Sequence, residues 1–223
     1  MPTATIISGL NVLSGAVALL ISYYAYKNNR LVGSILLRYI SVGFLLLGVS
    51  LFLQAGTENL VNTTAIEALR NRSLELVAFL LYTTLQLIAY GVFAWGYGLS
   101  FFSRSTSKSA AIPTVLATAA STATKRLIEA TALVLAIFLA SQIGIVVLLF
   151  LIVYQGIRVF SHTHSNLSLM VLFGFALIFV AHVIMLVAAL TLGATINLIG
   201  NTIEVCGFVS LLFFLYWSGR VVR

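Results

Sequence analysis

The sequence predicts an all-α integral membrane protein, and three observations support this. Of the 223 residues, 61% are hydrophobic and 8% are charged, and the mean hydropathy is +1.12. A soluble domain carries roughly 25% charged residues. No Asp, Glu, Lys or Arg occurs between Arg158 and Glu204, and a stretch of that length would expose a large apolar surface in water. In a bilayer, about 20 apolar residues suffice for one spanning helix.

Seven apolar segments follow one another along the chain, and we expect each to form a transmembrane helix. They cover residues 4–26, 32–55, 74–102, 127–142, 144–160, 168–192 and 196–219. Polar stretches separate most of them, such as YKNNRL after the first and SHTHSNLS after the fifth, and such stretches are typical of loops. We expect residues 1–223 to form a single membrane domain.

The segment 127–160 has two interpretations. Divided by a turn at Ser141, Gln142 and Gly144, it forms two helices, each shorter than a hydrocarbon core of about 30 Å. Undivided, it forms one long helix. The distribution of basic residues favours the division, because seven spans with the N-terminus outside leave only Arg70 and Arg72 outside among the Lys and Arg residues. Loops rich in Lys and Arg remain on the cytoplasmic side, so the C-terminus is expected there. Six spans would move Arg158, Arg220 and Arg223 outside.

Two stretches of the chain also resemble each other, which indicates an internal repeat. The stretch YYAYKNNRLVGSILLRYISVGFLLLG (23–48) has a tyrosine at a helix end, a basic turn, and then Gly43-Phe44 inside the next helix. The stretch YQGIRVFSHTHSNLSLMVLFGFALIF (154–179) repeats this order, with Gly174-Phe175 in the corresponding place.

The similarity extends to the third and seventh segments. Aligning LQLIAYGVF with IEVCGFVSL matches Gln86 with Glu204 and Tyr90 with Phe208. We therefore expect two parallel three-helix repeats, joined by a linking helix that crosses the membrane once. The first unit is 1–102, the linker with the fourth helix is 103–143, and the second unit is 144–223.

Two resemblances follow from these patterns. The layout of three helices, a linking helix and three more is similar to that of SWEET-type sugar transporters, although it shares no specific motif with them and lacks their helix prolines. The GF…AH and later GF pattern in the last two helices resembles poorly characterised polytopic membrane proteins of archaea. That resemblance covers mainly residues 154–219. It implies a membrane location and a role in signalling or assembly, and it brings no catalytic residues.

Polar side chains in the last helices form the candidate site. Glu204 lies about two turns into its helix, and His182 lies near the middle of the preceding one. Folding this helix pair about the turn near Ala194 brings the two side chains close together. Gln86 and Tyr90 complete the cluster if the two units pack as expected. Ionisable groups inside a membrane are costly and are usually paired.

Two interpretations of this cluster remain open. It is either a buried polar link between helices or a titrating site for a transported or sensed ligand, since histidine changes charge near physiological pH. No cofactor is expected: His182 is the only deep histidine, and the last helix has no lysine for retinal. No metal site and no catalytic motif are found, so we expect no enzymatic activity.

The surface offers few further signals. The net charge of +7 is explained by membrane orientation, so nucleic acid is not an expected partner. Asn62 and Asn71 begin N-x-S/T triplets on the expected outer side and are candidate glycosylation sites. Small-residue stripes at Ala132, Ala136 and Ala140 favour close helix packing within the bundle or against another subunit.

Two functions are consistent with these features. The first is a non-enzymatic sensing or assembly subunit that acts with membrane-protein partners or as a homo-oligomer. The alternative is a small solute or proton-coupled transporter, whose small-molecule ligand binds near the membrane midplane between the two repeats. Both functions place the chain in the plasma membrane as a multi-pass protein in contact with the lipid bilayer.

Overall fold

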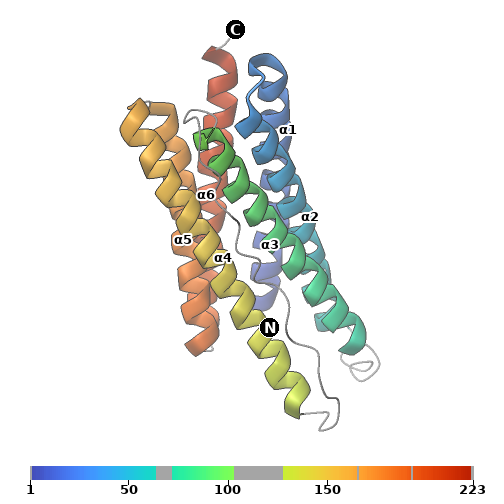
Figure 1. Cartoon of the computed structure of the whole chain (residues 1–223). Helices are drawn as coiled ribbons and strands as arrows, with labels where there is room; N and C mark the ends of the chain where they lie inside the picture. Colours follow the sequence, from blue (N-terminus) through green and yellow to red (C-terminus); the bar gives the residue numbers. More distant parts are fainter. Residues whose placement is uncertain (1, 64–71, 103–127, 165, 192, 222–223) are drawn as a thin grey trace.

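The protein is a bundle of α-helices in the part of the chain that the structure describes, as the computed structural model shows (Figure 1). The described residues are 2–63, 72–102, 128–164, 166–191 and 193–221. They form α1 (Pro2–Val32), α2 (Ile35–Thr63), α3 (Arg72–Phe102), α4 (Ile128–Thr163), α5 (Asn166–Thr191) and α6 (Ala194–Val221), and they contain no strand. Each of these six helices contains a stretch long and apolar enough to cross a bilayer. The protein is therefore a multi-pass helical membrane protein.

The division of residues 127–160 into two helices is wrong. A single helix, α4, runs from Ile128 to Thr163 without a break, and the expected turn at Ser141, Gln142 and Gly144 lies inside it. The Ser141 hydroxyl donates to the carbonyl of Phe138 at 2.7 Å, so it is satisfied within the helix instead of ending it. At about 1.5 Å per residue, α4 is longer than a hydrocarbon core of roughly 30 Å. No seventh helix occurs among the described residues, so the separate linking helix expected within 103–143 is also wrong. That segment's described part belongs to α4, and the two three-helix groups are α1–α3 and α4–α6.

Helices that follow each other across a short turn are antiparallel. At the turn between α1 and α2, Gly33 adopts a left-handed conformation with φ 66°, and its N–H donates to the carbonyl of Asn29 at 2.7 Å. Only glycine adopts this helix-ending conformation without strain. Farther along the same pair, Ser22 and Ser41 exchange hydrogen bonds with each other's carbonyls at 2.8 and 3.0 Å.

Helices α3 and α4 are parallel neighbours. The rings of Phe79 and Phe138 lie 6.0 Å apart. Farther along both helices, a methyl group added to Gly98 would lie 4.0 Å from Nε2 of Gln155. Both contacts advance in the same direction along the two helices. Phe102 and Ile128 therefore lie at opposite ends of the bundle (Figure 1).

The six described helices close into a ring. Each packs against the helices before and after it in the chain, and α6 completes the ring against α1, where Asn28 Nδ2 donates to the carbonyl of Leu215 at 2.9 Å. Because α3 and α4 are parallel, α1, α3, α4 and α6 run one way and α2 and α5 run the other (Figure 1). We call the end where α1 begins the N end and the end where α6 finishes the C end. The first and last described residues thus lie at opposite ends of the bundle.

The ring separates lipid-facing residues from an interior. Large apolar side chains such as Leu13, Phe150 and Phe213 are exposed on its outer face, as expected for a protein whose solvent is hydrocarbon. The interior holds a cluster of buried aromatic and aliphatic side chains. Polar side chains are buried in the same interior, and they form the candidate site.

Candidate functional site: a buried polar cluster between the helices

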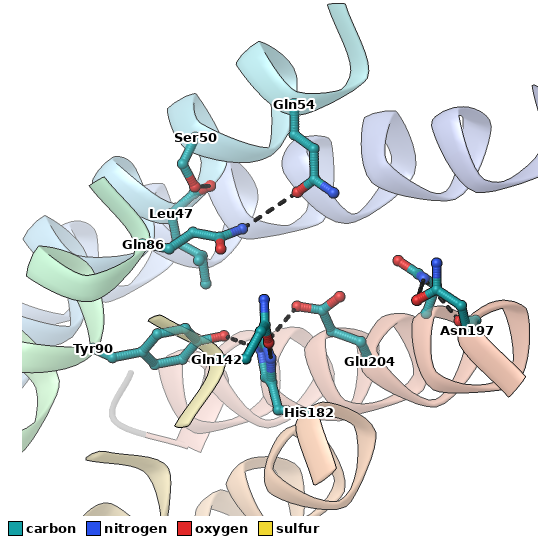
Figure 2. A network of polar contacts seen from close by, with 10 residues as sticks. Leu47, Ser50, Gln54, Gln86, Tyr90, Gln142, His182, Asn197 and Glu204 are labelled. Carbon is teal, nitrogen blue, oxygen red and sulfur yellow. Dashed lines mark hydrogen bonds and ion pairs between the residues drawn. The ribbon is translucent and has the colours of Figure 1, made fainter. Parts of the chain in front are cut away.

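Four side chains from four helices meet inside the ring: Tyr90 of α3, Gln142 of α4, His182 of α5 and Glu204 of α6 (Figure 2). We call these residues the polar cluster. Tyr90, His182 and Glu204 each lie within one helical turn of the centre of their candidate membrane spans. These three residues of the cluster therefore lie near the middle of their candidate membrane spans.

His182 is the centre of the polar cluster. Its Nε2 lies 2.9 Å from the Tyr90 hydroxyl and 3.6 Å from Oε1 of Glu204. Its Nδ1 lies 3.4 Å from Oε1 of Gln142. The structure therefore brings His182, Glu204 and Tyr90 together, and each of the two ring nitrogens faces a polar group from another helix.

The surroundings of His182 restrict where its protons lie. An amide oxygen only accepts hydrogen bonds, so Oε1 of Gln142 favours a hydrogen on Nδ1. In the neutral ring Nε2 is then an acceptor, and the Tyr90 hydroxyl donates to it. His182 and Glu204 are each only 3% exposed, and Tyr90 is fully buried. Burial this deep penalises any net charge that the imidazole and carboxylate fail to balance between them.

Gln86 lies apart from His182, on the opposite side of the interior. Its Nε2 donates to Oε1 of Gln54 on α2 at 3.4 Å, and no contact between Gln86 and His182 is among those observed. Figure 2 shows the two glutamines facing the polar cluster across the ring. Gln86 thus extends the polar interior to α2 and does not bind the imidazole.

An aromatic layer borders the polar cluster on the side of the C end. It consists of Phe44, Phe93, Phe175 and Phe208, which come from four helices and are nearly fully buried. The Phe44 ring lies 4.7, 6.3 and 5.9 Å from the rings of the other three. Tyr90 joins the two regions, because its hydroxyl contacts His182 and its ring lies 6.0 Å from that of Phe93.

The interior between the polar cluster and the N end is polar. Ser8, Asn11 and Ser14 line the buried face of α1, and each is at most 2% exposed. Thr83 of α3 and Asn201 of α6 are also buried there. In the half near the C end, the buried polar side chains Ser22, Ser41 and Asn28 bond to backbone carbonyls of neighbouring helices. Most buried polar side chains thus lie in the half near the N end, while the hydroxyl-bearing Tyr97 and the Oε1 atom of Gln155 are buried in the other half.

Sequence reasoning missed Gln142, Gln54 and Asn11. Gln142 was assigned to a turn, because the length of segment 127–160 favoured a break there. A lone amide inside a long apolar run was the available signal, since such residues usually face the interior of a membrane bundle. For α1, the spacing of Ser8, Asn11 and Ser14 places all three on one helix face.

The remaining candidates lie away from this interior. Asn62 is in the last turn of α2, at the N end, while Asn71 lies outside the described residues. His162 and His164 are at the opposite end of the bundle from Asn62. Within the described ranges, no group of three or more potential metal ligands occurs. Cys206 is exposed on α6.

Comparisons with known proteins provide no assignment. No family model matches the chain, and no curated protein or solved structure matches it significantly. The function is therefore inferred from the geometry of the polar interior alone.

Proposed function

We propose that the protein is a small-solute transporter of the plasma membrane, with its binding site at the polar cluster between two three-helix repeats. The observation that carries the proposal is the hydrogen bond between Tyr90 and His182. It connects α3 of the first unit with α5 of the second, close to the midplane. Transporters built from repeats bind their substrates at the midplane between the repeats.

The burial pattern supports a repeat relating α1 with α4. At one constant offset in the sequence, five of the six residues described as buried in α4 match a buried residue of α1, while Ser141 aligns with the partly exposed Leu10. The matched pairs are Asn11 with Gln142, Ser14 with Ile145, Ala18 with Leu149, Ile21 with Ile152, and Ala25 with Gly156. The same offset aligns Phe44 of α2 with Phe175 of α5, both in the aromatic layer. A repeat relating the two units would produce these matches.

Helices α3 and α6 match in the same way at an offset of their own. Their buried positions coincide at Thr83 with Asn201, Gln86 with Glu204, Ala89 with Gly207, Tyr90 with Phe208, Phe93 with Leu211, Gly96 with Phe214, and Tyr97 with Leu215. The alignment that matches Gln86 with Glu204 therefore pairs two buried polar side chains at the same depth.

One contact between helices is also repeated. A methyl group added to Gly43 of α2 would collide with Phe93 of α3, and one added to Gly174 of α5 would collide with Leu211 of α6. Gly43 corresponds to Gly174, and Phe93 corresponds to Leu211, under the same two offsets. The closed ring agrees with this relation. Helix α3 packs against α4, and its counterpart α6 packs against α1, the counterpart of α4.

The basic residues support an orientation with the C end in the cytoplasm. Those at the C end are Lys27, Arg30, Arg38, Arg158 and Arg220, and Arg72 lies at the N end. Lys and Arg accumulate on the cytoplasmic side of membrane proteins. Six spans were expected to move Arg158 outside. Because α4 runs parallel to α3, Arg158 nevertheless lies at the C end, with most of the other basic residues. We therefore place the N-terminus outside and the polar half of the interior toward the outside.

Uptake into proteoliposomes tests the transporter. The probes are three small polar solutes, a neutral sugar, a neutral amino acid and a primary amine, each followed by light scattering during osmotic swelling. We expect at least one to enter faster than into protein-free vesicles, and Glu204→Gln to abolish this uptake. Cys206→Ser, on the lipid-facing surface of the same helix, is the matched control and should leave uptake unchanged. Absence of uptake together with a membrane partner retained through purification would contradict the proposal.

A sensing or assembly subunit is the second candidate, and one observation favours it. Ala136 and Ala140 of α4 are exposed on the outer face of the ring. Small residues on a lipid-facing helix allow another helix to approach closely. These positions therefore suit contact with a membrane-protein partner or a second copy of the chain.

A further inference from the structure

We propose that His182 and Glu204 bind the proton that drives transport, and that this proton exchanges with the outside in the arrangement seen here. The inference rests on the proposed function and names its coupling ion. The proton forms an N–H bond at Nε2 of His182, where it lies between the Tyr90 hydroxyl and the Glu204 carboxylate. On release it leaves Nε2 and returns to water.

The net charge of His182 and Glu204 decides whether the buried pair holds the proton. The side chains of His182 and Glu204 are each 4% exposed, with Nε2 and Oε1 3.6 Å apart. A carboxylate beside an unprotonated imidazole carries one net negative charge, which is costly inside a membrane. One bound proton makes the pair neutral. The closed arrangement of the helices therefore corresponds to the proton-loaded pair.

The neighbours of the imidazole allow Nε2 to gain and lose a proton. Gln142 on α4 holds a hydrogen on Nδ1 in both states, because its amide oxygen accepts from it at 3.4 Å. Tyr90 on α3 is 2.9 Å from Nε2, and a hydroxyl both donates and accepts. It donates to the bare nitrogen and, after rotation of the O–H bond, accepts from the protonated one. Tyr90 and Glu204 are the titratable groups facing His182 from the helices packed around it.

The two halves of the interior give the proton one route. Between the pair and the N end lie the buried side chains Asn11, Thr83 and Asn201, whose polar groups can hydrogen-bond to entering water. Between the pair and the C end lies the aromatic layer, which offers no such groups. The proton therefore exchanges through the polar half, which the orientation proposed above places toward the outside.

The repeat relation limits the site to one proton. The offsets that relate the two units match His182 with Leu51 and Glu204 with Gln86. Neither Leu51 nor Gln86 can be ionised. The corresponding place in the first unit therefore holds no second acid–base pair, and one proton binds at His182 and Glu204.

Nuclear magnetic resonance of protein labelled with ¹⁵N-histidine tests the inference directly. The chain has three histidines, and His182→Gln identifies the signal of His182. The chemical shifts of the two ring nitrogens distinguish each neutral form from the protonated one. We expect the His182 signal to change between the form with hydrogen on Nδ1 and the doubly protonated form as the pH is varied. His162 and His164, at the C end, are internal controls.

Glu204→Gln provides the decisive comparison. Without the carboxylate beside Nε2, the pH dependence of the His182 signal should differ from that of the wild type. Should Glu204→Gln fail to fold, Glu204→Asp keeps the charge at a greater distance and should change the pH dependence less. A His182 signal that holds one form at every pH, or the same titration in wild type and variants, overturns the inference. Titration without solute uptake would instead contradict only the transport function, and uptake without titration would contradict only the coupling proton.

Discussion

Tyr90 of α3 and His182 of α5 contact each other inside the ring, near the middle of their candidate membrane spans. Their polar atoms lie 2.9 Å apart, and their rings are nearly perpendicular, with centroids 5.4 Å apart. The hydroxyl fixes the imidazole from one side and Gln142 fixes it from the other. Side chains of α3 and α4 thus hold the imidazole of α5 between them.

Replacing Tyr90 with Phe tests this connection. The variant keeps the ring against Phe93 but removes the hydroxyl, leaving Nε2 of His182 without its shortest contact. We expect a loss of about 1–3 kcal/mol in the free energy of unfolding, because a buried polar atom loses its partner. Thermal unfolding in detergent measures the effect. Tyr23→Phe, with a ring 56% exposed on the outer face, is the control and should be neutral, and equal effects of the two substitutions would show that the hydrogen bond is unimportant.

Replacing Gly43 or Gly174 with Ala tests the repeated contact between helices. Each methyl group would collide with a bulky side chain of the next helix, Phe93 or Leu211. We expect each variant to lose about 1–3 kcal/mol of stability, the usual cost of overpacking. Gly91→Ala, where nothing lies within 4 Å of the added methyl, should be neutral or slightly stabilising. Stability loss at only one of Gly43 and Gly174 would contradict their equivalence.

Much of the fold could be predicted because a hydrocarbon environment requires long apolar helices, which are visible in the sequence. The low charge and the spacing of polar stretches predict membrane helices, and five of the six described helices correspond to one expected segment each. Helices α1 and α2 extend beyond the expected ends, and YKNNRL, expected to be a loop, is part of α1. The continuity of α4 could not be predicted. The positive-inside argument depended on the direction of each helix, and that direction depends on the parallel packing of α3 against α4. No local sequence pattern indicates which helices pack against each other.

In the candidate site too, local contacts could be predicted from the sequence and contacts between distant helices could not. The pairing of His182 with Glu204 follows from folding two helices about the short turn near Ala194, which is local geometry. Gln142 depends on contact between α4 and α5 in a part of α4 that was expected to be a turn. Gln54 and Asn11 depend on closure of the ring. These contacts belong to the tertiary arrangement and leave only a weak trace in the sequence, as isolated amides on apolar helices.

Cysteine accessibility tests the side from which the polar interior is reached. In a Cys206→Ser background, Thr83→Cys places a thiol in the polar half, and Ile152→Cys places one in the apolar half. We expect a small membrane-impermeant thiol reagent added outside cells to label Cys at position 83 slowly and position 152 not at all. Faster labelling at position 152 would reverse the proposed access.

Substitution on the outer face of α4 tests the second candidate function. Ala136→Leu combined with Ala140→Leu would block close approach of another helix, because larger side chains hold helices apart. If a partner or second copy packs there, the particle mass in detergent should fall to that of the single chain. Val147→Leu, at another exposed position of α4, is the control. An unchanged mass would exclude this face as the contact.

Sided labelling of the two chain ends tests the central claim most directly. In the Cys206→Ser background, one variant carries Thr3→Cys near the start of α1 and the other carries Ser218→Cys near the end of α6. Because α1 and α6 run in the same direction and the proposed orientation places the N end outside, we expect an impermeant reagent to label position 3 in intact cells and position 218 only after the membrane is permeabilised. Labelling of both positions from the same side would contradict the parallel arrangement, and with it the access route proposed for His182 and Glu204.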